Sequence, residues 1–135
     1  MTYQEKLDWL NRYREAEKQY QRLSWRLAEA QSASRHTAQK LTAAPGGSGD
    51  GQALARAVER EDEAERKVYA QQAVCDQLFA EIDTVLNQLA SNRAYCILRQ
   101  YYLNGQTWEK VAEEAELSLR RVYVIRRQAV NLLEI

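Results

Sequence analysis

The sequence predicts an all-α protein: a long antiparallel helical hairpin with coiled-coil packing, followed by three short helices. Only one proline and five glycines interrupt the 135 residues, and 28% of the residues are charged, a composition typical of long helices. Four of the five glycines fall in one stretch, Leu41 to Gly51. Apolar residues repeat every seven positions on both sides of that stretch. We therefore expect a hairpin over residues 1–90 and a separate domain over residues 91–135.

The first long helix is expected over residues 2 to about 39. Two neighbouring rows carry its apolar pattern. One row consists of Tyr13, Tyr20 and Leu27, and the other consists of Trp9, Ala16, Leu23 and Ala30. The three- and four-residue steps between these rows predict a helix that packs along a coiled-coil seam. With a rise of about 1.5 Å per residue, the helix would be roughly 55 Å long.

The stretch LTAAPGGSGDG, residues 41–51, predicts a break between the helices. A glycine-rich loop can also cradle phosphate groups. That function requires a preceding strand and a lysine followed by serine or threonine, whereas Gly51 is followed by Gln52 and Ala53. We therefore interpret residues 41–51 as a flexible hairpin connection.

The second long helix is expected over about residues 52–89. Its main apolar row contains Leu54, Val68, Cys75, Ile82 and Leu89, interrupted by Glu61. Two helices of similar length joined by one loop should pack antiparallel. This arrangement would bring Trp9 and Leu10 close to Ile82 and Leu86. The apolar face is widest from Phe79 to Leu89, so part of it needs a further partner. We expect both the helix over residues 92–103 and a second copy of the protein to cover it, which predicts a homodimer formed through the hairpin.

A short helix over residues 92–103 is expected to begin after Ser91 as its N-cap and to end at Asn104 and Gly105. Its apolar face consists of Ala94, Tyr95, Leu98, Tyr101 and Tyr102. We expect these tyrosines to pack in the core. Proteins that bind single strands stack bases on exposed aromatic rings, whereas these rings lie on an apolar helix face that should be buried.

Two further helices are expected at residues 108–115 and 118–133, with Thr107 and Ser118 as N-caps. Only Glu116 and Leu117 remain for the turn between them, so the helices must cross steeply, as in a helix-turn-helix. The second of these helices is expected to bury Val122, Ile125, Ala129 and Leu132, at steps of three, four and three.

The opposite face of that helix is rich in arginine. Its residues are Leu119, Arg120, Arg121, Tyr123, Val124, Arg126 and Arg127. An arginine presents a fork of donors that fits a phosphate or the O6 and N7 atoms of guanine. We therefore expect double-stranded DNA to bind this face, with Ser118 at the leading end and Lys110 contacting phosphate. The alternative is an ordinary solvated helix surface.

The run CILRQYYLNGQTWEKVAEEAELSLRRVYVIRRQAVNLLE resembles region 4 of the sigma-70 family. The matching positions are Leu98, Tyr101 and Tyr102 in the first helix, Val111 and Ala112 in the second, and Leu117, Ser118, Val122 and Ala129 in the turn and third helix. The resemblance implies a helix-turn-helix that docks in the major groove. Glu116 departs from the family pattern, because that turn position needs a positive φ and is often glycine; the substitution would cost roughly 1 kcal/mol.

The whole chain also resembles short prophage proteins with a helical hairpin ahead of a sigma-like helix-turn-helix, akin to the RinA and ArpU late-gene regulators. The resemblance implies a transcription regulator that binds DNA. The hairpin would dimerise the protein or contact RNA polymerase or another regulator. Because no signal peptide or membrane span is present, we expect the protein in the cytoplasm. Two other functions stay open. One is DNA recognition for phage packaging, as in small terminase subunits, and the other is that of a coiled-coil interaction protein.

Several other classes of function are not favoured. The formal net charge is zero, so a nucleic-acid footprint must be local. Cys75 and Cys96 do not form a zinc or disulfide pattern, and both are expected to be buried thiols. His36 stands alone in a polar stretch, and no catalytic or metal-ligand motif is present, so we expect neither an enzyme nor a cofactor. No apolar segment approaches the ~20 residues of a membrane span.

Overall fold

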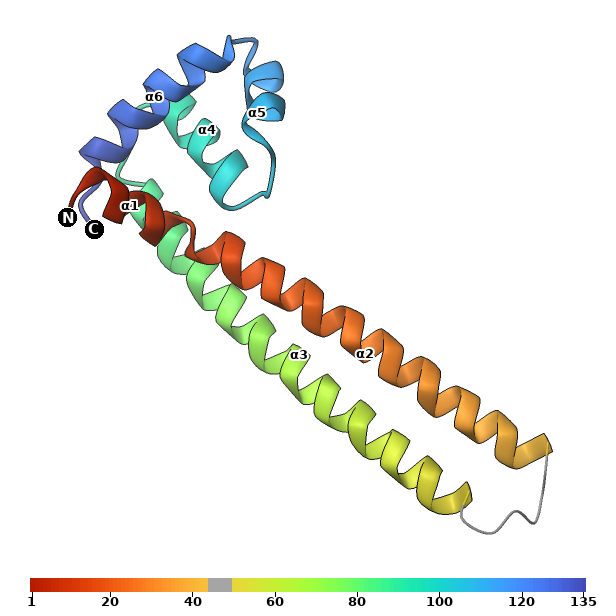
Figure 1. Ribbon diagram of the computed structural model, residues 1–135. Coiled ribbons are helices and arrows are strands. Elements are labelled where there is room, and N and C mark those ends of the chain that lie inside the picture. Colours follow the sequence, from red (N-terminus) through yellow and green to blue (C-terminus); the bar gives the residue numbers. More distant parts are fainter. Residues whose placement is uncertain (44–49) are drawn as a thin grey trace. The chain divides into compact units, whose positions relative to one another are not determined.

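The computed structural model describes residues 1–43 and 50–135, and every regular element in these ranges is an α-helix (Figure 1). The helices are α1 (Tyr3–Leu10), α2 (Arg12–Ala43), α3 (Asp50–Leu86), α4 (Asn92–Tyr102), α5 (Trp108–Ala115) and α6 (Leu119–Leu132). The all-α class is therefore confirmed. The central part of the expected loop, residues 44–49, lies outside the described residues.

The loop is expected to begin at Leu41 and to end at Gly51, but both residues are helical. Helix α2 continues to Ala43, and α3 already begins at Asp50. Gly51 lies in the first turn of α3, where a backbone N–H needs no partner within the helix. At its other end α3 stops at Leu86, three residues before the expected end.

Contacts between residues divide the chain into two compact units. The terminal unit contains residues 1–17 and 75–135, and the hairpin unit contains residues 18–74. This grouping differs from the boundary at residue 90 that the sequence predicts. The reason is that Leu10, Ile82 and Leu86 belong to the same hydrophobic core as α4, α5 and α6.

Asn11 interrupts the N-terminal stretch that the sequence pattern predicts as a single helix. It ends α1, and α2 begins at the next residue. Arg12 Nε donates a hydrogen bond to the carbonyl oxygen of Trp9 at 3.0 Å. A side-chain donor inside the ladder of backbone hydrogen bonds is a known cause of helix bends. Within the terminal unit, the bent chain places the fully buried Leu10 in the core.

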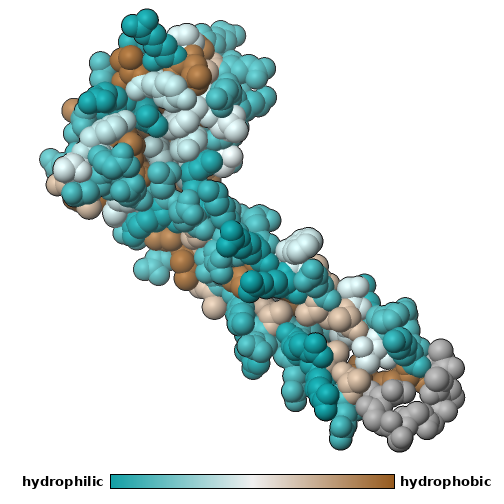
Figure 2. Space-filling view, in the orientation of Figure 1, coloured by the Kyte–Doolittle hydropathy of each residue, from teal (hydrophilic) through white to brown (hydrophobic). Residues whose placement is uncertain are grey.

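In the hairpin unit, α2 and α3 lie side by side and antiparallel (Figure 1). Leu23 and Ala57 are buried between them, at 9% and 5% exposure. In contrast, Trp25 and Tyr69 are 70% and 68% exposed. Figure 2 shows a mostly hydrophilic visible surface over these two helices. The pair therefore has a thin apolar seam and leaves two large aromatic side chains in solvent.

The terminal unit has a larger hydrophobic core, to which α1, α3, α4, α5 and α6 all contribute. Its most deeply buried side chains are Leu10, Ile82, Leu86, Ile97, Leu98, Tyr102, Val111, Val122, Val130 and Leu133. The apolar face expected for α4 is confirmed at Ala94, Leu98 and Tyr102, which are all buried, and α5 buries Val111.

Two expectations about buried residues are wrong. Leu132 is 74% exposed, whereas Val130 and Leu133 are 0% and 1% exposed. Helix α6 packs against α1 as well as against α4 and α5. Because of this additional contact, the buried side of the chain includes Val130 and Leu133. Cys75 is buried as expected, but Cys96 is exposed, because it lies on the solvent side of α4.

The expected N-caps are confirmed. The side-chain oxygens of Ser91, Thr107 and Ser118 each accept a hydrogen bond from the backbone N–H three residues on, at 3.1–3.2 Å. Glu116 has the positive φ that the turn requires, with φ 56° and ψ 41°. Leu117 completes the turn, so only three residues separate α5 from α6.

Hydrogen bonds fasten the start of the chain to the end of α6. Lys6 Nζ donates to the carbonyl oxygens of Asn131 at 3.2 Å and Leu133 at 2.7 Å. A lysine at this position also complements the negative end of the helix dipole. Gln88 and Glu134 exchange two hydrogen bonds, of 2.9 and 2.8 Å, so the segment after α3 is fastened to the same place.

Replacement of Leu10 by alanine tests whether α1 belongs to the core of the terminal unit. Because Leu10 is 0% exposed, we expect Leu10→Ala to lower the free energy of unfolding by about 2–5 kcal/mol. Leu132→Ala, which removes an exposed leucine, should change it by less than about 0.5 kcal/mol. Urea denaturation followed by circular dichroism measures both. Equal effects of the two changes would show that α1 does not complete this core.

Candidate nucleic-acid interface

Helix α6 is held with one side buried and the other exposed. On the inner side, Val122, Ile125 and Ala129 are 0%, 8% and 3% exposed, and the helix contacts α4 and α5. Ser118 caps its first turn, and Lys6 binds carbonyl oxygens at its last turn. The groups left unsatisfied at helix ends thus have partners at both ends of α6. The outer side chains are therefore presented from a well-anchored helix.

The outer side of α6 is positively charged. Arg120, Arg121 and Arg127 are exposed, and α6 contains no aspartate or glutamate. Within the described residues, none of the three guanidinium groups forms an ion pair with a carboxylate. Their charge and hydrogen-bond donors are therefore available for an anionic partner, and the planar donor fork fits a phosphate or a guanine edge.

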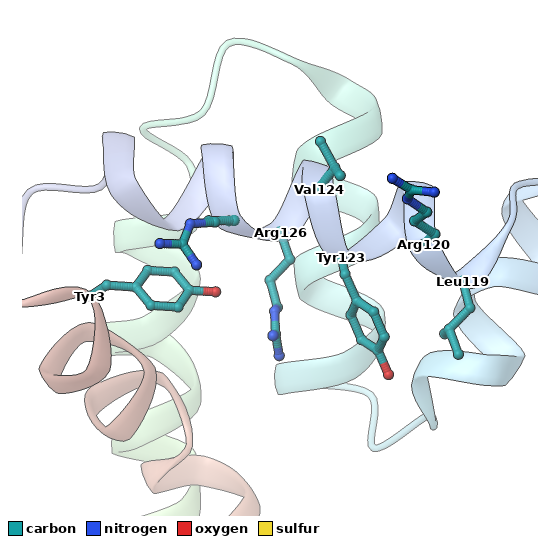
Figure 3. Close-up of a pocket in the computed structure, with 7 residues that line it drawn as sticks. Tyr3, Leu119, Arg120, Tyr123, Val124 and Arg126 are labelled. Atoms are coloured by element: carbon teal, nitrogen blue, oxygen red, sulfur yellow. The ribbon is translucent and has the colours of Figure 1, made fainter.

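A hollow of about 540 Å³ lies beside this face, within the about 300–1,000 Å³ that is usual for ligand sites. It is lined by Tyr3, Leu119, Arg120, Tyr123, Val124, Arg126 and Arg127. Figure 3 shows that Tyr3 projects from α1, whereas the other labelled side chains come from α6. The structure thus brings together six of the predicted site residues and adds one that was not predicted.

Tyr123 and Val124 are exposed apolar side chains, at 38% and 39% exposure. The Tyr123 ring makes an edge contact with Trp108, with ring centroids 6.0 Å apart. Val124 has no such aromatic support and points away from Tyr123 in Figure 3. Its isopropyl group can therefore meet a thymine methyl group, as the sequence pattern suggests.

Arg126 is placed differently from the other arginines of α6. The sequence interpretation puts it on the outer face, gripping phosphate, but it is only partly exposed. Its guanidinium carbon lies 5.1 Å from the centroid of Trp108 and 5.2 Å from that of Tyr123. Burial raises the pKa of the nearby Tyr102 phenol far above its ordinary value, and the Arg126 charge opposes that rise. Arg126 therefore serves first to hold α5, α6 and the α4 tyrosine together.

Arg121 lines a second hollow, of about 350 Å³. Arg93, at the start of α4, and Gln128 line the same hollow, together with the exposed Leu132. The two hollows have no lining residue in common. Arg120 and Arg121, adjacent in sequence, are therefore presented to different hollows.

Lys110 lies among carboxylates on α5. Its Nζ is 3.9 Å from Glu113 Oε2 and 4.0 Å from Glu114 Oε1, and all three side chains are well exposed. Such exposed pairs contribute little stability. However, the two carboxylates compete with a DNA phosphate for the lysine, and their negative charge would repel that phosphate. The role expected for Lys110 stays a prediction, and the structure does not bring Lys110 to the hollow beside α6.

Sequence reasoning missed Tyr3 and Arg93. Tyr3 lies outside the heptad rows of the first helix; its spacing from Leu7 and Leu10 indicates an apolar helix face but not which helix that face meets. It reaches α6 only because the chain bends at Asn11 and Lys6 fastens α1 to α6. Arg93 is an isolated arginine near a helix start, and its place beside Arg121 depends on tertiary packing.

Comparisons do not place the chain in a family: it matches no protein-family model, no curated protein and no solved structure. In residues 1–43 and 50–135, acidic residues, histidines and cysteines form no group that could hold a metal ion. Across the same two ranges, each helix is too short or too polar to pass through a bilayer.

Arg126→Gln tests the packing role of this arginine. The change removes a cation that contacts two aromatic rings, so we expect the free energy of unfolding to fall by about 1–2 kcal/mol. Arg120→Gln, which alters an exposed arginine of the same helix, should leave it within about 0.5 kcal/mol of the unchanged protein. Thermal and urea unfolding give both values. A loss of DNA affinity without a loss of stability in Arg126→Gln would instead assign Arg126 to the binding surface.

Proposed function

We propose that the chain is a DNA-binding transcription regulator, of the prophage type that its sequence resembles, and that it docks α6 in the major groove. One observation carries the proposal: the exposed side of α6 presents Arg120, Arg121 and Arg127 without carboxylate partners among the described residues. Helices exposed only to water usually mix both signs of charge. Several exposed guanidinium groups on one anchored helix are suited to a polyanion.

The dimensions and the turn geometry support the major groove. Helix α6 has 14 residues and is therefore about 21 Å long, and the groove, about 12 Å wide, admits one α-helix. The close spacing of α5 and α6, with a left-handed residue at Glu116, supports the assignment of these helices as a helix-turn-helix. In this proposal Ser118 marks the leading end, and Leu119, Arg120 and Val124 lie nearest the base edges.

The charges of α5 restrict how the duplex is approached. Glu109, Glu113 and Glu116 are all exposed on α5 or at its end. These carboxylates would repel phosphate groups, so the docked orientation must keep α5 further from the backbone than α6. In this orientation Arg127 and Arg121 contact phosphates, which position the protein, and the leading end of α6 reads the sequence.

Arg120→Gln combined with Arg121→Gln tests the proposal. If each subunit neutralises about five phosphates, the logarithm of the affinity should fall with log salt concentration at a slope of about −4 to −5. Loss of two cations should reduce the steepness by about 2 and weaken binding, since each phosphate contact contributes about one to the slope. Fluorescence anisotropy with a labelled duplex at several salt concentrations measures both effects.

A matched control is available in the hairpin unit. Arg56 and Arg66 are also exposed, so Arg56→Gln with Arg66→Gln makes the same change in net charge away from α6. We expect this variant to bind DNA like the unchanged protein. The proposal fails if both double variants lose affinity equally, because binding would then reflect overall charge, or if the unchanged protein binds no duplex.

The exposed aromatics of the hairpin unit favour a second role, as an oligomerisation surface. Trp25 and Tyr69 are 70% and 68% exposed, and large exposed aromatic groups are typical of interaction sites. We propose that this unit forms the homodimer. A two-fold dimer would present two α6 helices to half-sites about 34 Å apart.

The mass of the protein in solution, measured by light scattering, distinguishes a dimer from a ring assembly and from a single chain. We expect a mass of two chains, and Trp25→Ser with Tyr69→Ser should reduce it to one chain because the apolar contact is lost. Val124→Ser, at an exposed position of α6, should leave the mass unchanged. A mass far above a dimer would favour the ring assemblies of a packaging protein. A single chain in the unchanged protein would remove the dimer from the proposal.

A further inference from the structure

We propose that one strand of the bound duplex runs through the hollow between α1 and α6, and that Tyr3 contacts its sugar–phosphate backbone. This inference rests on the proposed DNA binding and extends it, because it adds the N-terminal helix to the interface. The proposed ligand of the hollow is a nucleotide unit within the duplex: a phosphate for the guanidinium groups and a deoxyribose for the aromatic rings.

The lining of the hollow combines the two chemistries that a sugar–phosphate unit requires. Beside α1, Arg127 supplies an exposed guanidinium group and Tyr3 an aromatic ring, whereas Arg120 faces the base edges in the proposed docking and Arg126 is held by Trp108 and Tyr123. None of the described residues that line the hollow is acidic. A phosphate would therefore meet donors and positive charge, and the apolar face of the sugar would meet ring carbons.

Tyr3 is held in place on the edge of this hollow. The Arg127 guanidinium carbon lies 5.2 Å from the centroid of the Tyr3 ring. Three residues further along α1, Lys6 donates hydrogen bonds to the carbonyl oxygens of Asn131 and Leu133. The buried Leu10 fixes the other end of α1 in the core. Tyr3 is therefore positioned by the folded core and needs no ordering when DNA binds.

Geometry favours the backbone over a base edge as the partner of Tyr3. Arg120 and Arg127 are seven residues apart and are thus separated by about 10.5 Å along α6. This length corresponds to about three nucleotides of one strand, at about 3.4 Å of axial rise each. Tyr3 comes from α1 and not from α6 (Figure 3). If α6 lies in the major groove, Tyr3 is therefore beside the strand that borders the groove and contacts the backbone of that strand.

Tyr3→Ala and Arg127→Gln, alone and combined, test this contact. We expect Tyr3→Ala to weaken binding about fivefold to twentyfold, as for loss of one well-placed aromatic contact. The loss should be similar for every duplex sequence, because a backbone contact carries no sequence information. The salt slope should not change, since no charge is removed, whereas Arg127→Gln should reduce its steepness by about one.

The two changes should also be coupled. Because Tyr3 and Arg127 contact each other and the same phosphate unit, the double variant should lose less affinity than the product of the single losses. Val58→Ala, which trims an exposed apolar side chain of the hairpin unit that is not part of the proposed dimer contact, serves as the control and should bind DNA normally. The probe is a labelled duplex of about 30 base pairs, long enough for two half-sites and their flanks.

A second measurement keeps the test decisive if Tyr3→Ala does not fold. A photo-crosslinking phenylalanine derivative at position 3 retains an aromatic ring and should form an adduct with the duplex; the same group at the exposed position 58 of the hairpin unit should not. Normal binding by Tyr3→Ala without an adduct, while Arg120→Gln with Arg121→Gln still weakens binding, would overturn this inference and leave the proposed function standing. Absence of binding by the unchanged protein would overturn both. Equal affinity for a polyglutamate peptide would also overturn this inference, because the hollow would then accept any polyanion.

Discussion

The burial of one side of α6 is the constraint on which the rest of the terminal unit depends. Val122, Val130 and Leu133 are almost completely removed from solvent, and four other helices contribute to the core that covers them. This packing decides which side chains of α6 remain outside. An arginine-rich helix without such an apolar side would have no reason to lie in one orientation, and its charges would not form a defined surface.

Three of the four arginines of α6 are exposed, and the fourth is used differently. Arg126 lies over Trp108 and Tyr123 and so joins the part of α6 nearest the hollow to α5. The contact costs the surface one cation but holds Tyr123 in place through both the ring of Trp108 and the guanidinium group. The binding surface and the core therefore share side chains, so changes at this border should alter stability and recognition together.

Local signals in the sequence predicted much of the fold. Ser91, Thr107 and Ser118 were recognisable as caps because a side-chain oxygen before an apolar run has a simple local use. The seven-residue repeats of apolar residues predicted the two long helices, because such a repeat can also be read from neighbouring positions in the sequence. The sequence did not reveal the bend at Asn11, the burial of Val130 in place of the expected Leu132, or the position of Tyr3. The bend accompanies a local hydrogen bond from Arg12 to Trp9. The other two depend on α1 packing against α6, a contact between opposite ends of the chain that no local pattern encodes. The charged face itself was predictable, whereas the sorting of its arginines between two hollows and an aromatic cluster was not.

The hydrogen bond from Lys6 to Leu133 joins residues that are 127 positions apart, and this has a consequence for any attempt to isolate the three C-terminal helices. A fragment cut at residue 90 would lack Leu10, Ile82 and Leu86, and it would leave apolar side chains of α4 and α6 open to water. Such a fragment should be prone to aggregation. A more promising minimal version would join residues 1–17 to residues 75–135 through a short connector in place of the hairpin unit. The shorter closed loop would also lower the entropy lost when the two ends meet, and should speed folding.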